Sequence, residues 1–227
     1  MYLKEVHLPS RDLVAQKRFY DTVLGVPLLE STPACLSYQI GASRLSLHRS
    51  DHPGIGHYHF AMNIPPQGYE DALAWITQRT PLVLNEKDSP VVYFENWDAH
   101  ALYFDDPEGN SLEFIARHSL KTPRQTFQGS ADILAISEIS QAVPNIADTV
   151  QTLKAQTGAN VYKNSISDEF AAVGDEEGLV ICVRIGREWF MNPGRVAKEC
   201  PTKIHIEDKN GLRIVGWTGG LFPGMGL

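Results

Sequence analysis

Three short segments carry the side chains that could do chemistry in this chain. Glu5 and His7 alternate in LKEVHL, His57 and His59 alternate in HYHF, and Glu113 lies within SLEFI. Residues two apart on a strand point to the same face, so each segment presents its polar groups on one side. Imidazoles and carboxylates gathered in this way are ligands for divalent metal ions. Taken alone, however, Glu5 and His7 fit solvated residues of an edge strand, and His57 and His59 fit a polar strand face against water.

Glu113 belongs to a predicted hairpin over residues 100–116, with the sequence HALYFDDPEGNSLEFIA. Pro107 fixes one backbone dihedral of the turn, and Gly109 supplies conformational freedom at its end. Apolar neighbours flank Glu113, and burying such a carboxylate is costly unless a cation or a hydrogen-bond donor meets it. Tyr103, on the first strand of the hairpin, is compatible with a core ring whose hydroxyl lies at the rim.

The composition limits the class of protein. The chain has 227 residues, 43% of them hydrophobic, and a formal net charge of -7. That charge, without any Lys/Arg run, argues against a nucleic-acid partner. No apolar run reaches the length of a membrane span, and the charged N-terminus does not look like a signal peptide. Three widely spaced cysteines indicate neither a disulfide framework nor a zinc site of the CxxC type, so we expect a cytoplasmic protein.

Hydrophobic periodicity predicts one unit, a strand followed by a helix and three strands, repeated about three times. The expected helices begin near Arg11 and Asp12, and at Tyr69 and Ile146, and they end near Gly25, Thr77 and Gln156. The expected strands cover residues 3–8, 26–30, 35–40, 44–49, 56–64, 81–85, 91–95, 101–104, 111–116, 134–143, 160–163, 170–173 and 179–184. A hairpin of residues 203–207 and 212–215 is expected in the tail.

The predicted fold class is α+β, built of repeated βαβββ modules. We expect residues 1–118 to form a complete pair of modules with the candidate metal site, and residues 119–130 to form a linker. Residues 131–227 then form a degenerate third module with a C-terminal β-hairpin. Glu138 takes the place of Glu5 in this third module and Cys182 that of Glu113, but no His matches His59. The third module is therefore expected to be structural.

Two segments resemble the vicinal oxygen chelate superfamily, which contains glyoxalases, fosfomycin-resistance thiol transferases and extradiol ring-cleavage dioxygenases. RDLVAQKRFYDTVLG resembles the helix signature, and LYFDDPEGNSLEF is similar to the hairpin that ends the second module. The latter also fits the second half of the extradiol dioxygenase signature, but residues 94–96 lack the His expected upstream. The resemblance covers residues 3–116, and residues 134–185 more weakly. It implies paired modules that curl into an open, cup-like mixed sheet around a divalent metal.

The resemblance implies that Glu5, His59 and Glu113 are the metal ligands and converge on one point. It also implies that Tyr103 is the catalytic residue, as a donor to a substrate oxygen. His7 is the fallback for Glu5, and His57 is the fallback for His59. Two carboxylates and one imidazole form a hard ligand set, which favours Fe(II) or Mn(II), with Zn(II) or Mg(II) as alternatives. With His7 in place of Glu5, the set becomes the two-His, one-carboxylate triad of non-haem iron oxygenases.

The leading function is a metal-dependent enzyme that acts on a small molecule with vicinal oxygens, with extradiol ring-cleavage dioxygenase first by motif. A glyoxalase-like lyase or isomerase, or a thiol transferase, is the second hypothesis. The third is a metal-free small-molecule-binding or scaffold protein of the same fold. A homodimer is expected, because a third module without a fourth leaves one sheet face in need of cover. The tail hairpin is the alternative cover for that face.

Overall fold

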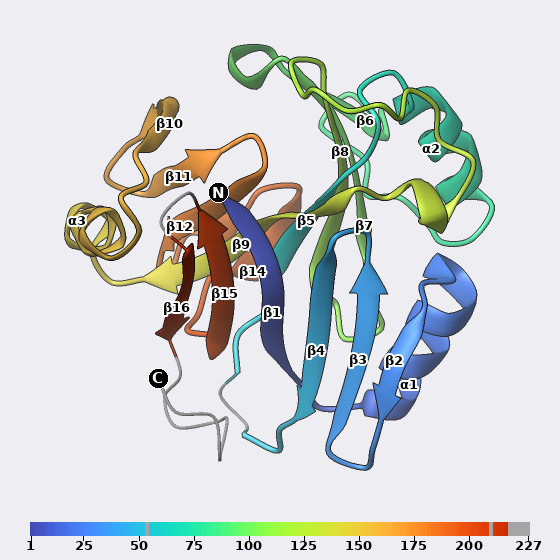
Figure 1. Cartoon of the computed structure of the whole chain (residues 1–227), viewed down its shortest axis with the longest axis horizontal. Helices are drawn as coiled ribbons and strands as arrows, with labels where there is room; N and C mark the ends of the chain where they lie inside the picture. Colours follow the sequence, from blue (N-terminus) through green and yellow to red (C-terminus); the bar gives the residue numbers. More distant parts are fainter. Residues whose placement is uncertain (53–54, 209–210, 218–227) are drawn as a thin grey trace.

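The computed structural model describes residues 1–52, 55–208 and 211–217. Most of the described strands form two sheets, one of six strands and one of eight. Figure 1 shows the sheets side by side, with a helix on the outside of each module. A large hydrophobic core includes residues of both sheets, among them Leu3 and Ile204 from one and Phe60 and Ile139 from the other. The α+β fold class and the curled sheets agree with the sequence prediction.

The first module contains β1 (Tyr2–Ser10), α1 (Leu13–Arg18), β2 (Leu28–Ser31), β3 (Cys35–Ile40) and β4 (Ser43–Arg49). The Asp12 carboxylate accepts hydrogen bonds from the amides of Val14 and Ala15, which starts α1 where the sequence predicts it. The helix continues as a π-helical segment, η1 (Phe19–Leu24), and stops at Gly25, whose φ of 62° favours glycine.

The second module contains β5 (His59–Asn63), α2 (Tyr69–Thr77), β6 (Val91–Phe94), η2 (Glu95–Trp97), β7 (Ala99–Asp105) and β8 (Ser111–Arg117). The predicted strand over residues 81–85 is wrong, because Leu82 makes only a single bridge to Phe104. The Asn85 side chain then accepts hydrogen bonds from the amides of Lys87 and Ser89, and this turn takes the chain out of the sheet.

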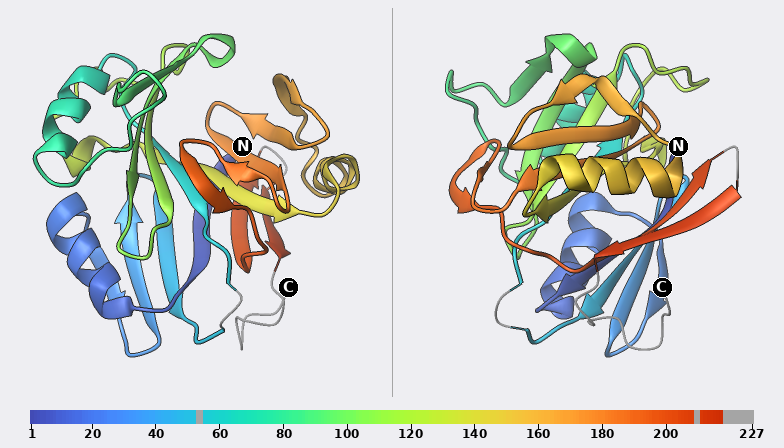
Figure 2. Two further views of the ribbon diagram at one scale, coloured as in Figure 1. Left: turned by 180° about the vertical axis from the view of Figure 1, so that it is seen from behind. Right: turned by 90° about the vertical axis from the view of Figure 1, so that its left-hand side faces the viewer.

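The third module contains β9 (Ala135–Val143), α3 (Ile146–Thr157), β10 (Val161–Ile166), β11 (Phe170–Asp175) and β12 (Gly178–Arg184), and η3 (Ser130–Asp132) precedes it. Figure 2 shows α3 lying across this module. A small hairpin that the sequence did not predict follows, β13 (Glu188–Trp189) with β14 (Asn192–Val196). The predicted tail hairpin is confirmed as β15 (Thr202–Asp208) with β16 (Gly211–Trp217), although residues 209–210 of its turn lie outside the described part.

The modules pair differently from the prediction. Each module has its strands in the order second, third, fourth, first, so the edge of its first strand is open. In the eight-stranded sheet, β5 of the second module pairs antiparallel with β9 of the third. In the six-stranded sheet, β1 of the first module pairs antiparallel with β15 of the tail hairpin. The complete pair is therefore modules two and three, not the pair within residues 1–118.

The turn between β7 and β8 joins the first module to the second. The buried Asp106 carboxylate accepts hydrogen bonds from Gln16 Nε2 at 2.7 Å, the Tyr58 hydroxyl at 3.1 Å and Asn110 Nδ2 at 2.8 Å. Glu108, two residues on, accepts hydrogen bonds from Ser10 Oγ and from the two amides before α1. The acidic turn found in the sequence thus holds the start of α1 against the second module.

None of the helices in the described part of the chain combines the length and the apolarity that crossing a membrane requires.

Replacing Asp106 should destabilise the protein because Gln16, Tyr58 and Asn110 would lose their shared acceptor. For Asp106→Ala we expect the free energy of unfolding to fall by about 3 kcal/mol, as for buried donors left unsatisfied. Denaturant unfolding measures this change. Asp51→Ala is the control, because the Asp51 side chain is 84% exposed, and its effect should stay within about 0.5 kcal/mol. Equal effects of the two substitutions would contradict the role given to the Asp106 network.

Candidate metal centre

Three buried side chains with possible metal-binding atoms lie around Ala61 in the middle of the eight-stranded sheet. On one side, parallel β8 places Glu113 opposite Ala61, and on the other, antiparallel β9 places Glu138 opposite the same residue. His59 lies two residues before Ala61 and therefore shares its face of the sheet. The methyl side chain of Ala61 leaves room above it. The register of three strands thus brings one imidazole and two carboxylates together.

The donor atoms of this group, which we call the cup site, are close enough to share an ion. His59 Nε2 is 3.4 Å from Glu113 Oε2 and 3.7 Å from Glu138 Oε2. One donor atom from each residue lies within 4.8 Å of the other two, and all three residues are buried. Ligand atoms around one ion are separated by comparable distances, since each bond is about 2.0–2.2 Å long.

His59 is oriented through its other ring nitrogen. Nδ1 lies 3.2 Å from the Ser111 carbonyl oxygen, which can only accept, so Nδ1 carries the proton of the neutral ring. The lone pair of Nε2 then faces the two carboxylates. Metal-ligating histidines are typically held in this way.

The buried carboxyl group of Glu113 is only partly satisfied by hydrogen bonds. Among the described residues, its Oε1 is buried and has no hydrogen-bond partner. Burial and the neighbouring Glu138 carboxylate raise the pKa of Glu113 well above its usual range, while Tyr103 and Arg117 act in the opposite direction. An ion bound beside Glu113 would compensate the buried charge. The structure therefore fits a divalent ion at this position.

Arg117 fixes Glu138. The guanidinium is fully buried, and its Nη2 donates to Glu138 Oε1. Its Nη1 donates to Asn63 Oδ1 and to Ser137 Oγ. Because Arg117 takes one oxygen of Glu138, the other oxygen remains directed toward His59. Arg117 also offsets one of the two negative charges of the cup site.

A cavity of about 420 Å³ opens beside the cup site, with His59 and Glu138 in its lining. Tyr103 also lines it and pairs across the strands with Glu113. The Tyr103 ring is stacked against the His59 ring, with 6.0 Å between centroids. Burial and the nearby Glu113 and Glu138 raise the pKa of Tyr103 well above its usual range, so its hydroxyl stays protonated and able to donate.

Aromatic rings form much of the cavity wall. The small hairpin of β13 and β14 contributes two of them, and Phe190 lies 5.6 Å from Phe94 and 5.9 Å from Tyr103 between ring centroids. The aromatic residues in the lining, besides Tyr103, are Tyr93, Phe94, Trp97, Phe170, Trp189 and Phe190. The cavity therefore suits a flat apolar group with polar atoms directed at the cup site.

The third module takes part in the site, which corrects the expectation that it is structural. Its contribution is Glu138, which the sequence analysis matched to Glu5 but set aside. The predicted match of Cys182 to Glu113 is also wrong, because β12 directs Cys182 into the hydrophobic core. Ile181 lines the cavity instead. An apolar side chain here leaves the group with three donors.

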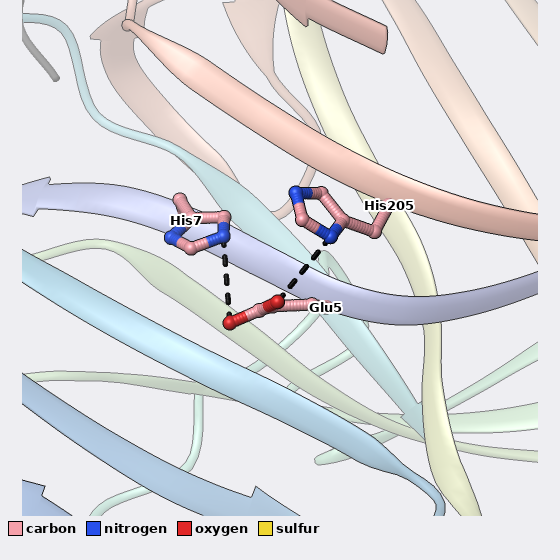
Figure 3. A group of neighbouring side chains, drawn as sticks. All are labelled: Glu5, His7 and His205. Carbon is pink, nitrogen blue, oxygen red and sulfur yellow. Dashed lines mark ion pairs between the residues drawn. The ribbon is translucent and has the colours of Figure 1, made fainter. Parts of the chain in front are cut away.

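The structure does not bring Glu5 to His59 and Glu113, so the predicted convergence of these three is wrong. Glu5 lies in the other sheet, grouped with His7 and with His205 of β15 (Figure 3). Burial, then the neighbouring His48 and other basic groups, lower the pKa of His7 to about 3, so its ring is neutral. Within the described residues, the fallback His57 belongs to neither group.

Sequence reasoning missed His205 and undervalued Glu138. Both lie on strands whose alternation is visible, in IHIE for His205 and in AISEIS for Glu138. Alternation predicts on which face of its strand a side chain lies, but it does not predict which other strand pairs with that strand. The signal for both residues was therefore present, and the missing information was the pairing of the modules.

No family model matches the chain, and no curated protein matches it by sequence. Solved structures do match. A structure named a putative dioxygenase from Bacillus subtilis is 17% identical with a TM-score of 0.59, over 93% of this chain and 72% of that one. A glyoxalase I mutant from Zea mays is 13% identical with a TM-score of 0.55, over 88% of this chain and 73% of that one.

Both matches span most of the chain. At these identities the likeness concerns the fold. The chain therefore has the fold of these dioxygenase and glyoxalase structures.

Proposed function

We propose that the chain is a metal-dependent enzyme acting on a small molecule that binds through two adjacent oxygen atoms. The observation that carries this proposal is the convergence of His59, Glu113 and Glu138 at an aromatic-lined cavity. The hard character of two carboxylates and one imidazole favours Fe(II) or Mn(II), with Zn(II) or Mg(II) as alternatives. When bound, the ion would act as a Lewis acid and orient the substrate oxygens.

The residues around the ion have separate tasks. Arg117 holds Glu138 in place, and the Ser111 carbonyl holds His59. Tyr103 keeps its proton and can donate a hydrogen bond to a substrate oxygen on which negative charge develops. The aromatic walls would align a flat ring. These tasks need no movement of the strands.

Among the reactions of the superfamily, ring cleavage of an aromatic diol by molecular oxygen is the one we favour. The lining of Phe94, Trp97 and Phe190 suits an aromatic ring, and the hairpin motif that resembles extradiol dioxygenases supplies Glu113. Oxygen uptake with a set of aromatic diols tests the assignment. Turnover of a glutathione hemithioacetal or thiol addition to an epoxide would favour the lyase or thiol transferase. Absence of a bound metal would favour a binding protein.

Glu113→Gln should remove the ion from the cup site, because a neutral amide replaces an anionic ligand. Isothermal titration of the metal-free protein with Mn(II) measures this loss. The variant should stay folded, since Glu113 Oε1 makes no hydrogen bond within the described residues that Gln would forfeit.

One control variant and one further ligand variant accompany the Glu113 experiment. Glu70→Gln changes an exposed carboxylate on α2 and should leave Mn(II) affinity unchanged. Glu138→Gln should weaken binding and also destabilise the protein, because it leaves Arg117 buried without its carboxylate. Equal Mn(II) affinity of the parent and Glu113→Gln would overturn the cup site.

Tyr103→Phe should lower turnover while leaving the metal bound, because only the hydroxyl is removed. We expect kcat to fall roughly 10²-fold, the lower range for loss of a positioned proton donor. Tyr69→Phe, which removes an exposed hydroxyl on α2, is the matched control. An unchanged kcat in Tyr103→Phe would show that the Tyr103 ring contributes packing and that its hydroxyl has no catalytic role.

The cytoplasmic location and the homodimer remain predictions. The tail hairpin pairs with β1, so one open edge of the first module is already covered. A dimer would then use other surfaces. Sedimentation at high micromolar concentration should give the mass of two chains, and the mass of one chain would contradict the predicted dimer.

A further inference from the structure

A second group of metal-ligating side chains lies in the six-stranded sheet. β15 places His205 directly opposite Glu5 of β1. His205 Nδ1 is 3.3 Å from Glu5 Oε2, and His7 Nε2 is 3.5 Å from Glu5 Oε1, as Figure 3 shows. We propose that Glu5, His7 and His205 bind a divalent transition-metal ion at a site separate from the cup site. This proposal does not depend on the proposed function.

The spacing of the three side chains suits a single small ion. One donor atom from each lies within 4.8 Å of the other two. Donor atoms bound at about 2.0–2.1 Å to a tetrahedral ion are about 3.3 Å apart. Small rotations of Glu5 and His205, whose side chains are each 21% exposed, would complete the approach.

The His7 ring is held through the nitrogen that faces away from Glu5. Its Nδ1 lies 2.9 Å from His48 Nε2 on the neighbouring β4. The contact occupies Nδ1 and leaves Nε2 directed at Glu5. Support of a ligating imidazole through its second nitrogen is the usual arrangement at metal centres. Burial of His7 between β15 and β4 restricts its ring further.

The ligand types predict which ions bind. Two imidazoles and one carboxylate suit Zn(II), Co(II), Ni(II) or Fe(II) better than Mg(II), which prefers oxygen. The cup site has the opposite balance of two carboxylates and one imidazole. The two sites should therefore differ in metal preference, and Zn(II) is the ion with which to probe the second.

Arg44 competes with an ion for Glu5. Its Nε is 3.3 Å from Glu5 Oε1, and its Nη2 is 3.0 Å from Glu30 Oε2. When an ion binds Glu5, Arg44 still has Glu30 as an ion-pair partner, so the guanidinium charge of Arg44 is not left without a carboxylate. The competition still weakens binding. Removing Arg44 should therefore tighten the site, an effect that a merely structural His–Glu cluster would not produce.

The experiment uses the full chain with Glu113→Gln, which disables the cup site. Zn(II) is titrated against a chromophoric chelator, and one equivalent should bind. Adding either His205→Gln or Glu5→Gln should abolish that binding. Adding Arg44→Gln should tighten it by roughly two- to fivefold, the range for an exposed ion pair. Thermal unfolding without metal verifies that each variant is folded.

His118→Gln is the matched control, because His118 Nε2 lies 2.7 Å from His100 Nδ1 and this exposed pair could also bind Zn(II). Loss of the ion with His118→Gln, but not with His205→Gln, would overturn the proposal. No Zn(II) binding in the Glu113→Gln protein would overturn it as well. Failure of the cup site alone would appear separately, as unchanged Mn(II) affinity in Glu113→Gln.

Discussion

The ion pair between Arg117 and Glu138 is the interaction on which the centre of the molecule depends. Arg117 ends the last strand of the second module, and Glu138 lies in the first strand of the third, so the pair joins the modules inside a sheet. Removing one partner of such a buried pair costs about 3–5 kcal/mol, because the other charge is left uncompensated. The pair offsets only one of the two carboxylates. A cation bound beside Glu113 would favour the ionised form of this second carboxyl group.

A topological constraint explains where both ligand groups lie. A βαβββ module leaves the edge of its first strand open, and this edge needs an antiparallel partner. In this structure β5 pairs with β9, and β1 pairs with β15. In each sheet the side chains at the junction of the two strands come from different parts of the chain. His59 and Glu138 meet at one junction, and Glu5 and His205 meet at the other.

The sequence predicted local structure well and module pairing badly, for one physical reason. Helix α2 and the hairpin around Asp106 depend on capping, turn residues and periodicity, all of which act over a few residues. The strand over residues 81–85 was lost because a turn at Asn85 overrides its apolar pattern. The partner of β1 is decided by contacts about two hundred residues away, at β15. Alternation gave the strand faces of Glu113 and His59, and the resemblance implied that they are ligands. Placing Glu138 and His205 beside their neighbours required the pairing of the modules.

The two ligand groups differ in what surrounds them, and this difference favours chemistry at only one of them. Beside the cup site, Tyr103 and the aromatic wall create a space in which a substrate could reach the ion. Because the Ile181 side chain offers no fourth donor, an ion bound here would keep coordination positions open for substrate oxygens. Around Glu5, the basic side chains of Arg44 and His48 approach the ligands from the sheet itself. An ion there would tie β15 to β1 and stabilise the folded chain by its binding free energy, without needing an open position.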